Sequence, residues 1–273
     1  MYRGYFINLD RESSRRESLT RNLAEIGAAS RYKRFSAIDG QTVASQYQTK
    51  LSPGQLGCWL SHLRVLESER NSDAHLHLVE DDVEFAQDSV ALCEKALECA
   101  LGTDWDLIFT EIWVPPDLDT FRHFSEKIGL YEREGMITVS SLRSNSFAGT
   151  SSYFVNKDSI GKVAGFLADN WKKGIPIDLW YRKLVSKGDL VAYVTVPFLT
   201  SRSPHSADSS IQPLRNLSSS VLGVYGRAFY KDADVTSLLA EMRQLTQGIQ
   251  DRPLSRLYGE LIHFLLSGER RGF

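Results

Sequence analysis

The chain has 273 residues, enough to bury the core of one large domain or of a domain with an appendage. Its 32 basic and 34 acidic residues give a net charge of −2, so the overall balance offers no electrostatic footprint for nucleic acid. The three cysteines, Cys58, Cys93 and Cys99, are too few and too unevenly spaced for a disulfide framework or a zinc cluster. This composition favours a reducing compartment, and we expect a cytoplasmic protein.

The amino terminus leads directly into a strand pattern. It lacks the basic region, the long apolar core and the cleavage site of a signal peptide. No stretch approaches ~18 uninterrupted apolar residues, the length of a spanning helix. We therefore expect a soluble protein, or one that binds a membrane peripherally.

Strand and helix patterns alternate through the first 110 residues. Residues 5–9 form a short apolar run typical of a buried strand, and a helix pattern follows until Gly27, a C-terminal stop signal. Ser52 and Pro53 suit the cap and first turn of another helix. The predicted order is strand 5–9, helix 14–26, strand 32–36, helix 53–70, strand 75–79, helix 88–101 and strand 107–110. Such alternation favours an α/β fold with a mostly parallel sheet and right-handed crossovers.

Beyond residue 110 the pattern changes to short strands of antiparallel character. The predicted elements are strands around Tyr131, over 136–142 and over 152–155, helices 158–170 and 177–186, strand 191–196, a Pro- and Ser-rich loop 200–213, and two helical stretches within 235–267 broken at Pro253. We divide the chain into a domain of residues 1–215, with halves 1–110 and 111–215, and a C-terminal helical extension of residues 216–273 packed on it.

Three consecutive acids, Glu80, Asp81 and Asp82, follow the apolar run 76–79. Adjacent carboxylates repel one another, and together they offer hard oxygen ligands to a divalent cation. In α/β proteins, ligands gather beyond the carboxyl ends of parallel strands, where this run is expected. The alternative is a solvated turn that caps the next helix.

The last helical stretch is amphipathic, with apolar residues at three- and four-residue steps: Leu254, Leu257, Leu261, Phe264 and Leu265. Core packing is the favoured use of this face. An anionic membrane surface or a second subunit, as in a homodimer, is the alternative partner.

Four segments in order carry a resemblance to a known family: residues 7–11 with Arg15 and Arg16, residues 37–40, residues 51–62, and residues 79–83. They resemble glycosyltransferase family 25, enzymes of lipooligosaccharide biosynthesis related to collagen galactosyltransferases. The resemblance continues more weakly through residues 149–153 and 176–178. It implies a GT-A-like glycosyltransferase fold, a Rossmann-like mixed sheet flanked by helices.

The resemblance also implies that the acidic run grips the diphosphate of a UDP-sugar through Mn²⁺ or Mg²⁺. Asp82 is the first choice of metal ligand, Glu80 another, and His205 in the 200–213 loop can complete the metal shell. Glu80 and Asp81 can also meet the ribose, the donor sugar or a coordinated water. The metal would neutralise the departing nucleoside diphosphate as a Lewis acid.

Donor contacts are implied for residues that match the family's segments: Asn8, Leu9, Arg11, Arg16, Asp39, Gly40, Gly57, Cys58, Ser61, His62, Glu80 and Asp81. Structural alternatives stand beside several of them. Asn8 and Asp39 suit turns that bond their own backbone. Arg15 suits a solvated helix face, and His62 suits a satisfied core position.

One departure from the family is Gln55, where many members have Glu. We expect a helix-capping role at this position, which Gln also performs. Inverting transfer needs a base for the acceptor hydroxyl. Asp178 is the candidate, with a helix N-cap as its alternative, and Glu111 is the competitor.

The sequence therefore predicts a glycosyltransferase that moves a sugar, most plausibly galactose from UDP-galactose, to a lipooligosaccharide, lipopolysaccharide or other surface glycan with inversion. One alternative is a catalytically weak glycan- or nucleotide-binding protein with the same fold. A metal-dependent phosphohydrolase is a weaker alternative, because residues 8–11 lack an Asp-x-Asp at the end of the first strand.

Overall fold

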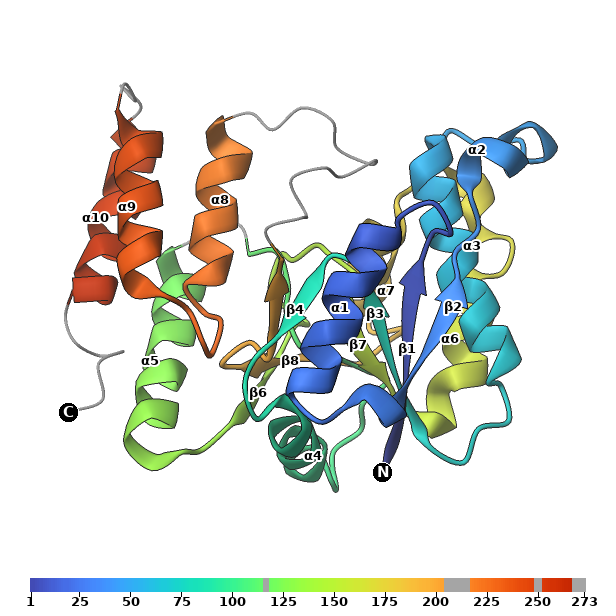
Figure 1. Ribbon diagram of the computed structural model, residues 1–273, viewed down its shortest axis with the longest axis horizontal. Helices are drawn as coiled ribbons and strands as arrows, with labels where there is room; N and C mark the ends of the chain where they lie inside the picture. Colours follow the sequence, from blue (N-terminus) through green and yellow to red (C-terminus); the bar gives the residue numbers. More distant parts are fainter. Residues whose placement is uncertain (115–117, 204–216, 248–251, 267–273) are drawn as a thin grey trace.

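The computed structural model describes residues 1–114, 118–203, 217–247 and 252–266. Within these residues a seven-stranded sheet forms the centre of the molecule (Figure 1). Its strands, in spatial order, are β2 (Tyr32–Ser36), β1 (Tyr2–Asn8), β3 (His75–Glu80), β7 (Ser152–Val155), β5 (Leu107–Phe109), β8 (Ala192–Val196) and β6 (Thr138–Ser141). Strands β7 and β6 run antiparallel to their neighbours, and the other adjacent pairs are parallel. The predicted α/β fold with a mixed sheet is confirmed.

Helices cover both faces of the sheet (Figure 1). One buried cluster joins the sheet to α1 (Ser13–Glu25) and α4 (Ser89–Cys99), and a second joins it to α3 (Pro53–Ser68), α6 (Ile160–Leu167) and α7 (Ile177–Lys187). Strand β3 shows why both layers are needed. Its Leu76 and Leu78 belong to the second cluster and its Val79 to the first, so the strand is apolar on both faces, as parallel strands between helix layers are.

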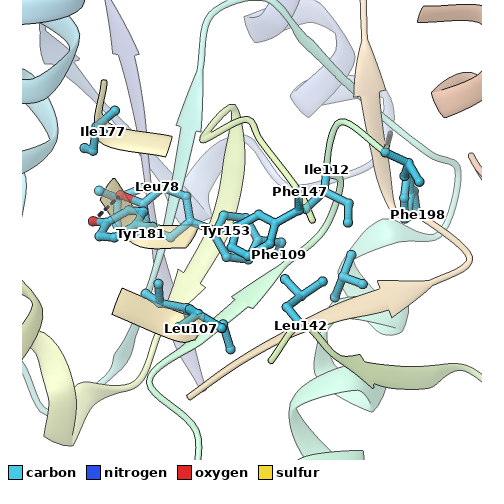
Figure 2. Packing of buried hydrophobic residues seen from close by; sticks show 14 of the residues in the cluster. Leu78, Leu107, Phe109, Ile112, Leu142, Phe147, Tyr153, Ile177, Tyr181 and Phe198 are labelled. Atoms are coloured by element: carbon cyan, nitrogen blue, oxygen red, sulfur yellow. Dashed lines mark hydrogen bonds between the residues drawn. The ribbon is translucent and has the colours of Figure 1, made fainter. Parts of the chain in front are cut away.

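Aromatic side chains fill the core between strands β5 and β7 and helix α7. Figure 2 shows Tyr153 of β7 between Phe109 of β5 and Tyr181 of α7. The hydroxyl groups of Tyr153 and Tyr181 lie 3.3 Å apart and hydrogen-bond each other. Both side chains are fully buried, so this bond offsets part of the cost of removing two phenols from water.

The predicted capping role of Gln55 is confirmed. Ser52 accepts from the Gln55 backbone N–H at 3.3 Å, and the Gln55 side chain accepts from the Ser52 N–H at 3.0 Å. This reciprocal capping box satisfies two amide groups at the start of α3. An amide serves here as well as a carboxylate.

The expected strand around Tyr131 is wrong, because Tyr131 lies in α5 (Leu118–Glu134). Phe121, Phe124 and Ile128 recur at three- and four-residue steps and are buried. Phe121 stacks on Tyr225 of α8 (Leu217–Arg227), a helix that lies within the predicted helical extension but for which the sequence indicated no bounds. Tertiary packing of the aromatic residues therefore overrides their strand propensity.

Three smaller differences concern the end of the sequence and one cysteine. Pro253 lies in the first turn of α10 (Arg252–Leu266), so the break follows α9 (Val235–Thr246) and precedes the proline. A helix tolerates proline in its first turn because the missing N–H has no helical partner there. The short strand β9 (Thr200–Arg202) lies within the predicted loop and pairs with β4 (Val83–Phe85). The sequence also predicts that Cys93 and Cys99 are buried helix residues; Cys93 is buried, but Cys99 is exposed.

The C-terminal helices α8, α9 and α10 stand beside α5 at one end of the molecule (Figure 1). Leu257 and Leu261 of α10 are buried in the same cluster as Phe121, so core packing is what the described part of this face does. The side chains of Leu254, Phe264 and Leu265, and the predicted division at residues 215 and 216, lie outside the described residues. Among those that are described, no helix combines the length and the apolar character needed to cross a membrane.

Two glycines let the backbone of α2 (Gly40–Val43) touch that of α3. A Cβ atom on Gly57 would lie 2.6 Å from the Ile38 carbonyl oxygen and 2.7 Å from the Gly40 nitrogen. These contacts are with backbone, which cannot swing away as a flexible side chain can. The pair therefore fixes the position of the segment 38–40 against α3.

We predict that Gly57→Ala destabilises the protein by about 1–3 kcal/mol, the usual cost of forcing an extra methyl into a packed site. The matched control is Gly165→Ala in α6, an exposed position where an added Cβ meets nothing within 4 Å. That change should stabilise by about 0.5–1 kcal/mol, since alanine restricts the unfolded chain. Urea denaturation of both variants measures the difference, and equal midpoints would contradict the close-approach argument.

Candidate functional site

The carboxyl ends of β1, β3 and β5 meet at one edge of the sheet. Asn8 is the last residue of β1, Glu80 is the last residue of β3, and Glu111 lies two residues after β5. Strand β7 is antiparallel and lies between β3 and β5, so its amino end, preceded by Ser151, reaches the same edge. The sheet topology thus gathers residues that are up to 143 positions apart in sequence at the location where α/β folds bind ligands.

A hollow of about 120 Å³ opens beside this edge, between the start of α1, the segment 37–41 and α3. Every predicted donor residue except Asn8 and Arg16 lines it: Leu9, Arg11, Asp39, Gly40, Gly57, Cys58, Ser61, His62, Glu80 and Asp81. Asp82 and Arg15 line it too. The structure therefore brings together most of the positions that the family's segments indicated.

Asn8 stands behind the hollow and positions Asp81. It is 1% exposed, and its amide donates to Asp81 Oδ2 at 2.7 Å and to the Glu12 carbonyl at 2.9 Å. Its Oδ1 accepts from Arg34 Nε at 3.0 Å. The backbone-bonding alternative for Asn8 thus describes part of its role, and the bond to Asp81 adds a link between β1 and the acidic run.

Arg15 reaches the site, contrary to the solvated-face interpretation. Its guanidinium lies 3.2 Å from Asp81 Oδ1, and its side chain is only 13% exposed. The neighbouring Arg16 does not line the hollow, and its charge acts on the exposed Asp10. Successive helix positions point about 100° apart, so only one of the two arginines can face the acids.

Arg11 and Asp39 pair with each other at the mouth of the hollow. Asp39 also caps α2, where its Oδ1 accepts from the Gln41 N–H at 3.0 Å. The turn alternative for Asp39 is therefore observed together with its place in the lining. Both groups remain accessible to a ligand, since the Arg11 side chain is 49% exposed.

Glu80 turns one oxygen toward α3. Its Oε1 lies 3.4 Å from His62 Nε2 and 3.7 Å from Cys58 Sγ, and accepts from Thr150 Oγ1 at 3.2 Å. Burial alone would raise the pKa of Glu80, but the hydrogen bond and charge of His62, with Arg202 and Thr150, lower it. The pKa of the Cys58 thiol is raised by burial and by the nearby Glu80 and Asp178, which keeps it protonated as a donor.

His62 is a fully buried member of this group. Its Nδ1 lies 2.8 Å from the Tyr153 hydroxyl, and the two rings stack. The core-histidine alternative agrees with this burial, while its Nε2 faces the hollow. Ser61 is also fully buried and is structural: it donates to the Gly57 carbonyl and accepts from the Ile38 N–H.

Of the three acids in the run, Asp82 is the one whose ionised form its surroundings disfavour most. Burial, followed by the negative charge of Glu80, raises its pKa to about 7, although Arg202 acts in the opposite direction. Among the described residues its Oδ1 is buried without a hydrogen-bond partner. A buried carboxylate oxygen without a donor is costly, and a cation would relieve that cost.

Three consecutive residues each bind a different acid. The Gly149 N–H donates to Asp178 Oδ2 at 3.2 Å, Thr150 binds Glu80, and the Ser151 hydroxyl donates to Glu111. Gly149 adopts φ +97°, a conformation that favours glycine. This short segment therefore fixes the relative positions of acids from three separate elements.

Asp178 and Glu111 differ in accessibility. Asp178 is half-buried in the first turn of α7, and Pro176 holds the N-cap position, so the N-cap alternative does not describe it. Its second oxygen accepts from the Leu179 N–H at 2.8 Å. Glu111 is only 8% exposed, and burial raises its pKa despite Arg202 and Ser151.

The sequence did not indicate that Arg202 belongs to the site, or that Thr150 and Ser151 hydrogen-bond its acids. Arg202 pairs with Val83 in the β4–β9 ribbon. The next residue, Ser203, donates its N–H to the Asp82 carbonyl at 2.8 Å. No local pattern marks Arg202, since it arrives from 120 residues downstream of Asp82. His205 lies outside the described residues.

The donor set fits a hard divalent cation such as Mn²⁺ or Mg²⁺. The unsatisfied Asp82 oxygen is the observation that supports the fit, and Asp81 and Glu111 add carboxylates whose pKa values burial raises. The arginines of α1 and the glycine backbone of α2 and α3 suit an anionic ligand beside it. Together the fold and site have the arrangement of an α/β protein that binds its ligand beyond the carboxyl ends of parallel strands.

Residues 1–180 match the family model described as glycosyltransferase family 25 (LPS biosynthesis protein). The chain belongs to this family and is a glycosyltransferase, as the sequence resemblance predicted. No curated protein matches the chain significantly. Among solved structures, the galactosyltransferase LgtC in complex with donor and acceptor sugar analogs aligns over 92% of this chain and 98% of its own, with 11% identity and a TM-score of 0.40.

We predict that Asp82→Asn stabilises the metal-free protein near pH 8 but not near pH 4. Because the folded pKa of Asp82 lies at about 7, above the ordinary value of 3.8, the folded state holds this proton more tightly than the unfolded state. The Asp82 contribution to stability therefore falls as pH rises from 4 to 7 and stays low above that. Thermal unfolding across pH in the presence of a chelator tests this. A variant that is less stable than wild type at pH 8 would contradict it.

Proposed function

We propose that this glycosyltransferase transfers galactose from UDP-galactose to a lipooligosaccharide, lipopolysaccharide or other surface-glycan acceptor, with inversion and with help from Mn²⁺ or Mg²⁺. The observation that carries the proposal is the acidic run at the end of β3, beside a hollow lined by arginines and close glycine backbone. The choice of galactose follows from the family resemblance, and the acceptor class follows from the family's description.

The donor nucleotide occupies the hollow in this proposal. Arg11 and Arg15 supply positive charge at its rim, and Gly40 and Gly57 allow a base or ribose to approach the backbone. Asp39 presents a carboxylate that can accept from a sugar hydroxyl. These groups bind and orient the donor so that its anomeric carbon lies toward Glu111 and Asp178.

Asp82 is the proposed principal ligand of the cation, with Asp81 or Glu80 assisting and His205 as a further proposed ligand. When bound, the cation neutralises charge on the departing nucleoside diphosphate. The positive charge of Arg202 acts on Glu80, Asp82 and Glu111 and lowers the pKa of each, in opposition to burial.

Asp178 is the proposed base. It takes the proton of the acceptor hydroxyl as that oxygen attacks the anomeric carbon and the bond to UDP breaks. Its half-exposed carboxylate can be reached by an acceptor, while the hydrogen bonds from Gly149 and Leu179 hold its orientation. The more deeply buried Glu111, bound by Ser151, is the competing candidate.

We also propose a cytoplasmic enzyme that meets a lipid-linked acceptor at a membrane surface. All three cysteines are free, as a reducing compartment permits. A homodimer through the C-terminal helices is the alternative use of that region.

Asp82→Asn should remove the Mn²⁺-dependent part of UDP binding, because it deletes a charged ligand while keeping the side-chain shape. Calorimetric titration of UDP with and without Mn²⁺ measures this. Asp73→Asn is the matched control, since Asp73 is 92% exposed and does not line the hollow. Wild-type behaviour of Asp82→Asn would remove the metal role from this residue.

Asp178→Asn should lower kcat by about 10²–10⁴-fold, the usual contribution of a positioned base, with little change in UDP affinity. Glu111→Gln is the comparison, measured with the same donor and acceptor. A larger fall in kcat for Glu111→Gln, with intact UDP binding, would transfer the role of base to Glu111.

A further inference from the structure

We propose that Cys58, His62 and Glu80 form a binding site for one thiophilic divalent cation of the Zn²⁺ type. The three side chains place Sγ, a ring nitrogen and a carboxylate oxygen within 4.8 Å of one another. This donor set differs in chemistry from the all-oxygen set around Asp82, because thiolate and imidazole ligands select zinc over Mn²⁺ or Mg²⁺.

Two of the three donor separations match a tetrahedral site. Zn²⁺ bonds of about 2.3 Å to sulfur and about 2.0–2.2 Å to nitrogen or oxygen separate nitrogen from oxygen by roughly 3.4 Å, and sulfur from oxygen by roughly 3.6 Å. The observed separations are 3.4 Å from His62 Nε2 to Glu80 Oε1 and 3.7 Å from Cys58 Sγ to the same oxygen. The third separation, between Cys58 Sγ and the His62 ring nitrogen, is at most 4.8 Å, so rotation of these side chains can bring all three donors to one cation.

The elements that carry the ligands hold them in place. Cys58 and His62 are four residues apart on α3, so both project from the same face of the helix. Glu80 ends β3 and is held by Thr150. With its proton on Nδ1, His62 donates to the Tyr153 hydroxyl and leaves Nε2 free for the metal, which is how outer hydrogen bonds orient metal-binding histidines.

The cluster is open on one side, because all three residues line the hollow. A cation can thus arrive from solvent and keep a fourth position for water. On binding, the Cys58 S–H bond breaks, the sulfur electron pair goes to the cation, and the proton goes to solvent. No oxidation or reduction takes place.

Occupation of this site should oppose donor binding. This consequence rests on the proposed function, which puts the sugar nucleotide in the same hollow. Zn²⁺ would then be an inhibitor that competes with the UDP-sugar, distinct from the cation that assists transfer.

The test uses the full-length protein after removal of metals by a chelator. Zn²⁺ is titrated by calorimetry, and Co²⁺ is added as a spectroscopic probe, since a cobalt–thiolate bond gives charge-transfer absorption. We expect one Zn²⁺ per chain and a thiolate band with Co²⁺. Cys58→Ser should abolish the band and weaken Zn²⁺ by more than the roughly 10–100-fold that loss of an outer-shell partner costs.

Three further variants separate the possible results. Cys99→Ser removes the exposed cysteine and should leave the band and the affinity unchanged. His62→Gln should weaken Zn²⁺ while the protein, checked by circular dichroism, stays folded. Asp82→Asn should keep the cobalt–thiolate band, because Asp82 is not one of the three ligands of this site.

Absence of stoichiometric Zn²⁺ binding to the wild type would overturn the proposal, as would binding that survives Cys58→Ser. UDP titrations with Mn²⁺, in the absence and presence of Zn²⁺, test the consequence. Failure of UDP to bind even without Zn²⁺ would count against the proposed function. The zinc titration would still show whether Cys58, His62 and Glu80 bind a cation.

Discussion

The arrangement of carboxylates at one sheet edge is the constraint on which the rest of this structure depends. Glu80, Asp81, Asp82 and Glu111 lie close enough that each changes the pKa of another, in surroundings that disfavour charge. Without hydrogen-bond donors or positive charges beside them, these buried carboxylates would destabilise the fold. Most of the nearby polar network therefore consists of donors aimed at these acids. Of the four, Asp82 retains a buried oxygen for which the described part of the chain supplies no donor.

The donors come from all around the edge because of the sheet's topology. Strand β7 runs antiparallel between β3 and β5, which places Gly149, Thr150 and Ser151 at the ends of parallel strands. Each of them binds a different acid. The inserted strand is thus the physical reason that acids from β3, from the segment after β5 and from α7 share one site.

If Asp82 binds the cation as proposed, stability and function make opposite demands at this residue. The site holds a carboxylate whose pKa is raised to about 7, so the metal-free fold is weakened by the charge that a hard cation needs. At Glu80 the balance differs, because His62, Cys58 and Thr150 already surround one oxygen. Neighbouring acids in the same run therefore suit cations of different chemistry: oxygen ligands around Asp82, and mixed sulfur, nitrogen and oxygen ligands around Glu80.

The sequence by itself determined the main strands and helices of the first 110 residues, though not α2 or β4. It also determined the capping box of Ser52 and Gln55, the acidic run and the family, because these depend on local patterns of a few residues. Only the tertiary structure decided that Arg15 rather than Arg16 faces the acids, and that α5 is a helix packed on α8. It also brought Arg202 and Thr150 to the site from distant strands and joined Glu80 to a cysteine and a histidine 22 and 18 positions away. Contacts of this kind form through strand order and helix packing, which no local pattern in the sequence encodes.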